Sequence, residues 1–250
     1  MSLRRLLIVL SSALCLLVGT AIPSSAAAIP HTTTAWRDDF NSLNTRTWRV
    51  VPWGCHAPGN VSVANGQLRL RTVARSSGPC PLVGARLDTI DKRTFAPGTY
   101  TARIKFAPRK GSWQTFWMTG GSGRPFPSRG EVDVAEILGR QPTVHHLRLH
   151  SAYADGRAGR CSQAADLVRP AGFLGQWHTY AVTTSATRAV FRVDGKVVAS
   201  FTRNRVCTWP FTDPMRMILT ANGGTWAGPP NKSLFPVTML VDWVSYKPNS

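Results

Sequence analysis

The sequence predicts an all-β protein, built as one antiparallel sandwich or jelly roll. Strand-like runs flank the two-residue turns Asn65-Gly66 and Asp194-Gly195, whose residues tolerate positive φ, as β-hairpins require. Apolar and polar residues alternate over 100–106 and again over 237–243, the pattern of half-buried strands. The one weak helical candidate is 162–168. Because no repeat or internal linker interrupts this pattern, we expect a single domain.

The first 28 residues have the organisation of a cleavable export signal. A basic start with Arg4 and Arg5 precedes an apolar run over 6–22, and Ala26-Ala27-Ala28 matches the small-residue cleavage pattern. A single anchoring helix is the alternative, but it needs about 20 uninterrupted apolar residues, and Pro23 follows the run.

Cleavage at this signal defines the expected mature protein. It would comprise a short extension at 29–36 and one domain at 37–250, with no later segment apolar enough to cross a membrane. We therefore expect a secreted, extracellular monomer.

Four cysteines remain after the signal, which contains Cys15. Four cysteines in an exported chain predict two disulfides, with three possible pairings. We expect Cys55–Cys80 and Cys161–Cys207, each joining a loop region to the rest of the fold. A zinc site is not expected, because the chain has no CxxC pair.

The charge of the chain is strongly positive. Without the signal, 28 basic residues face 12 acidic ones, a formal charge of +16. Such a field attracts anionic surfaces and polymers, so association with an acidic cell wall or a polyanion is an open possibility. The basic residues are scattered singly along strands (Arg69 and Arg71, for example) instead of forming a basic helix or arm, so no nucleic-acid partner is expected.

The two glutamates of the chain stand five positions apart, at Glu131 and Glu136, with Asp133 between them. Two carboxyl groups on one surface can supply the nucleophile and the proton donor for cleaving a glycosidic bond. Strict alternation would turn Glu136 inward, at a desolvation cost, whereas a β-bulge near Val134-Ala135 returns it to the face of Glu131. Carboxyl groups about 5–6 Å apart would fit a retaining mechanism. The alternative is an acidic strand facing solvent.

A strand just before these carboxylates carries several aromatic residues. On it Trp113, Thr115 and Trp117 share one face, and Phe116 and Met118 share the other. If Phe116 and Met118 are core residues, both indoles face a cleft, where flat rings can stack on sugars. The alternative is that Trp117 belongs to the core.

Three polar residues alternate along a later strand: His146, Arg148 and His150. Histidines on one face can bind a metal. A metal site is not favoured here, because no matching aspartate or cysteine cluster accompanies them.

The segment from Glu131 to Glu136 resembles the ExDxxE active-site signature of glycoside hydrolase family 16, the laminarinase and endo-β-glucanase family. The resemblance extends in order from about Asp38 to Tyr246. The other similar segments are Asp38-Asp39-Phe40-Asn41 with Trp48, Gly84-Ala85-Arg86-Leu87, Gly111 to Met118, Trp177-His178-Thr179-Tyr180, Val193-Asp194-Gly195-Lys196, Pro214-Met215 through Gly223-Gly224, and Val241-Asp242-Trp243-Val244.

The resemblance implies a concanavalin A-like jelly-roll β-sandwich with a concave substrate cleft. It makes Glu131 the nucleophile and Glu136 the general acid/base, with Asp133 holding Glu131. The charges of Glu131 and Asp133 would raise the pKa of Glu136. No cofactor is required, although Asp242 matches a position that binds structural calcium in some relatives. The residues expected to contact sugar are Arg86, Trp113, Trp117, His150 and Trp226.

The expected function is therefore that of a secreted endo-acting glycosidase that hydrolyses β-1,3 or mixed β-1,3/1,4 glucan with retention, its partner being the polysaccharide. One alternative is an anionic-galactan hydrolase or a transglycosylase on the same fold. Another is a non-catalytic carbohydrate-binding module, which is disfavoured because both glutamates are present. The basic segment 124–129 and the loop between Cys55 and Cys80 depart from the family pattern, and they leave the linkage specificity open.

Overall fold

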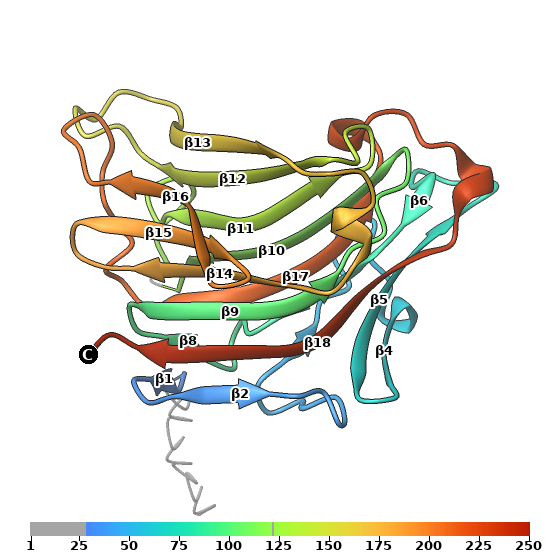
Figure 1. The fold of residues 1–250 in the computed structure, drawn as a ribbon, viewed down its shortest axis with the longest axis horizontal. Coiled ribbons are helices and arrows are strands. Elements are labelled where there is room, and N and C mark those ends of the chain that lie inside the picture. The colour runs from blue at the N-terminus through green and yellow to red at the C-terminus, as the bar shows by residue number, and fades with distance from the viewer. Residues whose placement is uncertain (1–28, 122) are drawn as a thin grey trace, which may run out of the picture.

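The fold is a sandwich of two β-sheets with the hydrophobic core between them (Figure 1). The computed structural model describes residues 29–121 and 123–250, so the expected signal at 1–28 lies outside the described residues. No helix within the described ranges is long and apolar enough to span a membrane. The helical elements described are short 3₁₀ turns: η1 (Pro58–Asn60), η2 (Phe173–Gly175), η3 (Thr225–Ala227) and η4 (Lys232–Leu234).

One sheet, which we call the cleft sheet, carries Glu131, Asp133 and Glu136 on its open face. Its main path follows the order β1-β8-β17-β10-β11-β12-β13, with β7 beside β17 and β3 beside β7. Its strands are β1 (His31–Thr32), β3 (Arg49–Val50), β7 (Ala85–Asp88), β8 (Thr94–Phe95), β10 (Ser112–Gly120), β11 (Glu131–Leu138), β12 (Val144–Ser151), β13 (Cys161–Val168) and β17 (Met215–Gly223).

The other sheet, the outer sheet, covers the back of the cleft sheet. Its path is β16-β15-β14-β9-β18-β5-β4, with β2 beside β18 and β6 beside β5. The strands are β2 (Trp36–Asp38), β4 (Val61–Ala64), β5 (Gln67–Ala74), β6 (Leu82–Val83), β9 (Gly98–Lys105), β14 (His178–Thr184), β15 (Arg188–Val193), β16 (Lys196–Thr202) and β18 (Val237–Pro248).

Alternating side chains from both sheets form the core, as the sequence pattern predicts. Phe116 and Met118 project from the cleft sheet and are fully buried, and Tyr100 and Ile104 of β9 meet them from the outer sheet. Both predicted hairpins are present. Asn65 and Asp194 begin their turns with positive φ. The all-β jelly-roll prediction is confirmed.

Two local predictions were wrong. Residues 162–168 are not helical, because they belong to β13, which pairs with β12 along its whole length and alternates between exposed and half-buried positions. Pairing with a neighbouring strand overrides the weak helical propensity of the segment. Trp243 does not continue the core alternation of β18, because a register shift after Val241 places Val244 in the core instead.

The N-terminal extension expected at 29–36 takes part in the sandwich. Residues His31–Thr32 form β1, which pairs in parallel with β8. Trp36 begins β2 and its ring lies 5.3 Å from that of buried Phe95. The chain is therefore anchored to both sheets before residue 37.

Candidate active site

A cleft of about 580 Å³ crosses the open face of the cleft sheet. All eight residues that the sequence analysis placed in catalytic or sugar-binding roles line this cleft, although they come from five separate segments of the chain. Their roles remain predictions, but the structure brings them together. They are Arg86, Trp113, Trp117, Glu131, Asp133, Glu136, His150 and Trp226.

A bulge in β11 places both glutamates on the open face. Asp133 pairs with Trp117 and Ala135 with Phe116, so Val134 is the extra residue, as the sequence predicts. Against β12 the register shifts over the same interval. Because the bulge adds one residue, Glu136 faces the cleft, while the side chain of Val134 is buried.

Gly130 shapes the entry into this strand. It adopts a φ of 76°, which glycine tolerates without strain. A Cβ at this position would lie 2.6 Å from Cγ of Pro210, so a side chain would also collide with the neighbouring loop. The residue before Glu131 is thus restricted to glycine by conformation and by space.

The carboxyl groups form a compact, largely buried cluster. Glu131 is half-buried, and the exposed fractions of Asp133 and Glu136 are only 8% and 9%. Oxygen atoms of Glu131 and Asp133 and a ring nitrogen of His150 lie within 4.8 Å of one another. The Nε2 atom of His150 is 3.4 Å from Oδ2 of Asp133. Asp133 therefore lies between the nucleophile candidate and a histidine.

Burial is the main electrostatic influence on the cluster. It raises the pKa of Glu131 and the negative charge of Asp133 raises it further, while His150 and Arg129 oppose the shift. Burial also raises the pKa of Asp133, against the charges of Arg148 and Arg160. These groups cannot all ionise without mutual repulsion, so the cluster favours retaining a proton near neutral pH.

Glu136 has the environment of a proton donor. Burial raises its pKa, and the charge of Asp133 adds to the shift. The family resemblance implies this effect from neighbouring charge, but desolvation is the larger cause. One oxygen of Glu136 accepts a hydrogen bond of 3.0 Å from the indole Nε1–H of Trp113, which orients the carboxyl group.

Two side chains of edge strand β13 form hydrogen bonds with the histidines of β12. Ser162 lies 2.7 Å from Nδ1 of His150, and Asp166 lies 2.9 Å from Nδ1 of His146. Arg148 forms an ion pair of 2.6 Å with the same Asp166. Burial lowers the pKa of His150. A neutral His150 that accepts from Ser162 has its Nε2–H available for Asp133.

Aromatic side chains lie along the cleft. Trp117 is half-buried, not part of the core, and its Nε1–H donates to Thr220 at 3.0 Å. The guanidinium of Arg86 covers its ring at 5.1 Å. Trp226 is 51% exposed, and Arg140 supports it through a ring contact and a hydrogen bond to its carbonyl. Both indoles line the cleft, where flat rings can stack on sugar rings.

Comparison with known families agrees with this geometry. Residues 54–245 match the family described as Glycosyl hydrolases family 16. The chain belongs to this family.

Family 16 relatives include a β-glucanase of Rhodothermus marinus, 28% identical over 175 residues that cover 64% of this chain. The aligned part spans only 60% of that relative's length. Among solved structures, an endo-β-1,3-glucanase of Pyrococcus furiosus is 26% identical, with a TM-score of 0.75 over 86% of this chain and 94% of the other. A non-specific endo-β-1,3(4)-glucanase of family 16 is 28% identical, with a TM-score of 0.73 over 89% and 94%.

Several cleft residues of this family 16 chain escaped the sequence analysis. Trp53, 69% exposed, lines the cleft together with His56, and the two residues lie on either side of Cys55, which forms the Cys55–Cys80 disulfide. A tryptophan beside a cysteine in a Pro- and Gly-containing loop was the available signal, but loop residues have no periodicity that places them in a fold. The others are Arg160, Ser162, Ala164, Thr220 and Asn222. Thr115 and Arg148 also line the cleft, and strand alternation had already placed them beside Trp113 and His150, without a role.

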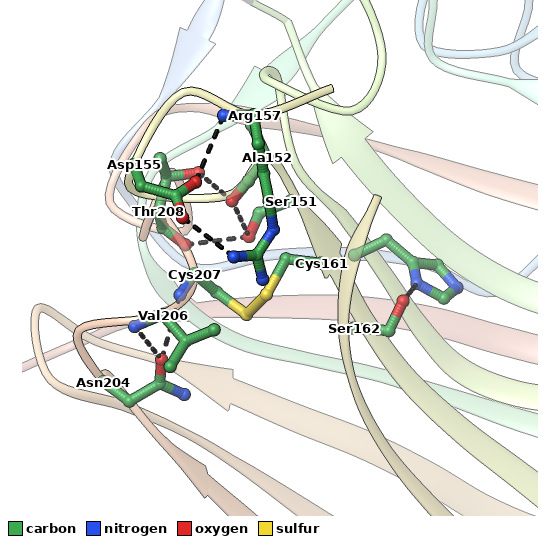
Figure 2. The surroundings of a disulfide bond; sticks show 11 residues. Ser151, Ala152, Asp155, Arg157, Cys161, Ser162, Asn204, Val206, Cys207 and Thr208 are labelled. Atoms are coloured by element: carbon green, nitrogen blue, oxygen red, sulfur yellow. Dashed lines mark hydrogen bonds and ion pairs between the residues drawn. A yellow bond between two sulfur atoms is a disulfide. The ribbon is translucent and has the colours of Figure 1, made fainter. Parts of the chain in front are cut away.

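Both predicted disulfides form, Cys55–Cys80 and Cys161–Cys207. Figure 2 shows the second, which joins the start of β13 to the segment around Cys207. Asn204 accepts hydrogen bonds from the backbone N–H groups of Val206 and Cys207 and so orders that segment. Ser162 follows Cys161 directly, so this covalent link also fixes the hydrogen-bond partner of His150.

The surroundings of Asp242 do not fit the structural calcium ion that the family resemblance implies at this position. Its carboxylate forms an ion pair of 2.6 Å with Arg103, and the Trp177 ring covers that guanidinium at 5.0 Å. No cluster of three or more metal-ligating side chains within the described residues includes Asp242. A dication here would have to displace an arginine.

Proposed function

We propose that this chain is an endo-acting glycosidase that hydrolyses β-1,3 or mixed β-1,3/1,4 glucan with retention of anomeric configuration. The observation that carries the proposal is the bulge in β11, which brings Glu131 and Glu136 to one face of a cleft flanked by exposed indoles. Relatives described as β-1,3- and β-1,3(4)-glucanases support the choice of glucan.

In the proposed reaction the carboxylate of Glu131 attacks the anomeric carbon. The protonated Glu136 donates its proton to the glycosidic oxygen as the bond to the leaving sugar breaks. The resulting carboxylate of Glu136 then takes a proton from water, whose oxygen attacks the same carbon and releases Glu131. Asp133 and His150 act as positioning residues for Glu131. The residues alone account for these steps, without a cofactor.

The raised pKa of Glu136 suits the first step, because it extends to higher pH the range in which the group holds the proton that it must donate. Trp113 orients that proton donor and also presents its ring to the sugar. The cluster therefore assigns different roles to two chemically identical side chains through their surroundings.

Two alternatives use the same site. Transfer of the glycosyl group to another sugar hydroxyl instead of water would make the chain a transglycosylase, and an anionic galactan could replace glucan. A binding module is the alternative of a different class, and the retained glutamates disfavour it. We further propose that the chain is exported, acts extracellularly as a monomer, and associates with cell-wall polysaccharide.

The decisive experiment is product analysis on a panel of polysaccharides. New reducing ends from laminarin or barley glucan are expected, with activity reduced by several orders of magnitude in Glu131→Gln and in Glu136→Gln. Azide should restore turnover to Glu131→Ala and yield a glycosyl azide of inverted configuration, because the anion replaces the missing nucleophile. Size redistribution without new reducing ends would indicate transfer, and binding without either would indicate a module.

A further inference from the structure

A second cavity of about 490 Å³ adjoins the catalytic cleft. The two share Trp53, Arg86 and Trp117 as lining residues, so the second cavity extends the cleft toward β7 and β3. Three further arginines line it, from three different segments: Arg49 of β3, Arg129 before β11, and Arg216 of β17.

Positive charge in this cavity exceeds the negative charge that faces it. Of its lining residues four are arginines, and Asp88 is the one carboxylate. Asp88 is fully buried, and both of its carboxylate oxygens have partners. One oxygen pairs with Arg86 at 2.6 Å, and the other accepts a hydrogen bond from the backbone N–H of Ile90. Arg216 reaches it only at 3.9 Å. Arg49 pairs with Asp91 outside the cavity.

Three of the guanidinium groups that line the cavity each have one donor without a partner. The Nε atoms of Arg86, Arg129 and Arg216 are buried and have no hydrogen-bond partner among the described residues. Arg129 also forms no ion pair with any of the described residues. Burial lowers the pKa of Arg216; Asp88 opposes the shift, and the charges of Arg86 and Arg129 add to it. Each of these guanidinium groups therefore has fewer protein partners than donors, so the protein compensates its charge only in part.

We propose that this cavity is a subsite for an anionic group, a sulfate ester or a carboxylate, carried by the polysaccharide chain that occupies the cleft. Guanidinium forks match both anions with paired, charge-assisted hydrogen bonds. The shared wall of Trp53 and Trp117 places a stacked sugar next to the arginines. The inference rests on the proposed glycan-hydrolysing function and adds a preference for glycan chains that carry an acidic or sulfated substituent.

The test compares laminarin, laminarin sulfate and carboxymethyl-laminarin of matched low substitution. Binding is measured by calorimetry in the Glu131→Gln background, so that hydrolysis does not interfere. Each polymer is titrated against three further variants, Arg216→Gln, Arg129→Gln and Arg188→Gln. Arg188 is exposed on β15 of the outer sheet, so it matches the change in net charge away from the cavity.

One of the anionic polymers should bind about tenfold more tightly than laminarin, the gain expected from charge-assisted hydrogen bonds. That preference should largely disappear in Arg216→Gln and Arg129→Gln and persist in Arg188→Gln. Whether laminarin sulfate or carboxymethyl-laminarin binds more tightly identifies the preferred anion. Arg129→Gln is expected to fold normally, because Arg129 forms no ion pair with a carboxylate within the described ranges. It therefore keeps the test valid if Arg216→Gln fails to fold.

Equal affinity for the three polymers would overturn the proposal. So would a preference that Arg188→Gln reduces as much as the cavity variants do, because the whole charge of the protein would then explain it. If the unmutated protein hydrolyses none of the polymers but the anion preference follows the cavity arginines, the proposed hydrolysis fails and the subsite stands.

Discussion

At the scale of single residues, the site concentrates carboxyl groups where water is largely excluded. Burial deprives the charged forms of these groups of hydration, so their raised pKa values also represent a cost to folding. Between the ordinary pKa of Asp133, near 4, and its raised value, the folded protein binds more protons than the unfolded chain. Stability contributed by this group must therefore fall as pH rises through that interval.

The first prediction follows for Asp133→Asn. The substitution removes a charge that the fold holds at a cost, so it should raise the free energy of unfolding at pH 8 by on the order of 1–3 kcal/mol. At pH 4, where the native carboxyl is protonated, the two proteins should be nearly equal. Denaturant unfolding at both pH values measures the difference. Activity should fall, because Glu131 loses its positioning group.

Asp194→Asn is the matched control with the opposite sign. Burial opposes the shift, but hydrogen bonds from Thr179 and His178 lower the pKa of Asp194. Its charged form therefore stabilises the fold above its ordinary pKa, and this substitution should destabilise the protein at pH 8. Stabilisation at pH 8 by both variants would point to a general effect of net charge and contradict the argument.

The second prediction concerns the indole of Trp113. Its hydrogen bond lowers the pKa of Glu136, against burial, which raises it. Trp113→Phe keeps an aromatic face but loses the N–H, so the pKa of Glu136 should rise. Since Glu136 must be protonated for the first step, the alkaline limb of the kcat/KM profile should move to higher pH.

Trp117→Phe separates this effect from stacking. The Nε1–H of Trp117 bonds Thr220 and no carboxyl group. Losing it should raise KM for glucan and leave the pH profile in place. An unmoved alkaline limb in Trp113→Phe, measured beside this control, would mean that Glu136 does not set that limb.

At the scale of secondary-structure elements, alternation and the cost of burying charge were sufficient to predict the bulge in β11. The bulge solves a local conflict, namely a glutamate that would otherwise point into the core. Strand β13 was not predictable in the same way, because its strand character comes from pairing with β12. That strand supplies Ser162 and Asp166, so the supporting partners of both histidines were also missed.

The third prediction tests what the disulfide at β13 contributes. Replacing Cys161 and Cys207 together with serine should destabilise the protein by about 2–4 kcal/mol and also raise KM, because Ser162 would hold His150 less firmly. The pair Cys55→Ser and Cys80→Ser should cost similar stability. This second double variant should instead raise KM for substrates that are long enough to reach Trp53. Measurements of KM with substrates of increasing length test this.

Thiol titration of the unmutated mature protein provides the independent check. No free thiol should react without reductant, because the four cysteines of the domain are paired. Two or more reactive thiols would refute the framework. Unchanged unfolding in either double variant would show that the disulfide in question does not constrain the fold.

At the scale of the whole molecule, the order of strands in the two sheets explains why distant segments meet. β10 lies between β11 and β17 in the cleft sheet, and β17 also pairs with β7. The tryptophans of β10, the carboxylates of β11 and Arg86 of β7 therefore lie close together. Sequence alternation predicts which face each side chain occupies but not which strands are adjacent. For that reason the cleft could be predicted only through the family resemblance, and the arginine-lined cavity beside it could be found only in the three-dimensional structure.

The fourth prediction concerns export. A basic start, an apolar run and Ala26-Ala27-Ala28 predict cleavage after Ala28. The described fold is consistent with a mature chain that starts there, since β1 begins at His31 and is paired within the sandwich. Expression with the native leader should release a culture-medium protein whose first residue is Ile29, as N-terminal sequencing would determine. A membrane-bound product that retains residues 1–28 would instead support the anchoring-helix alternative.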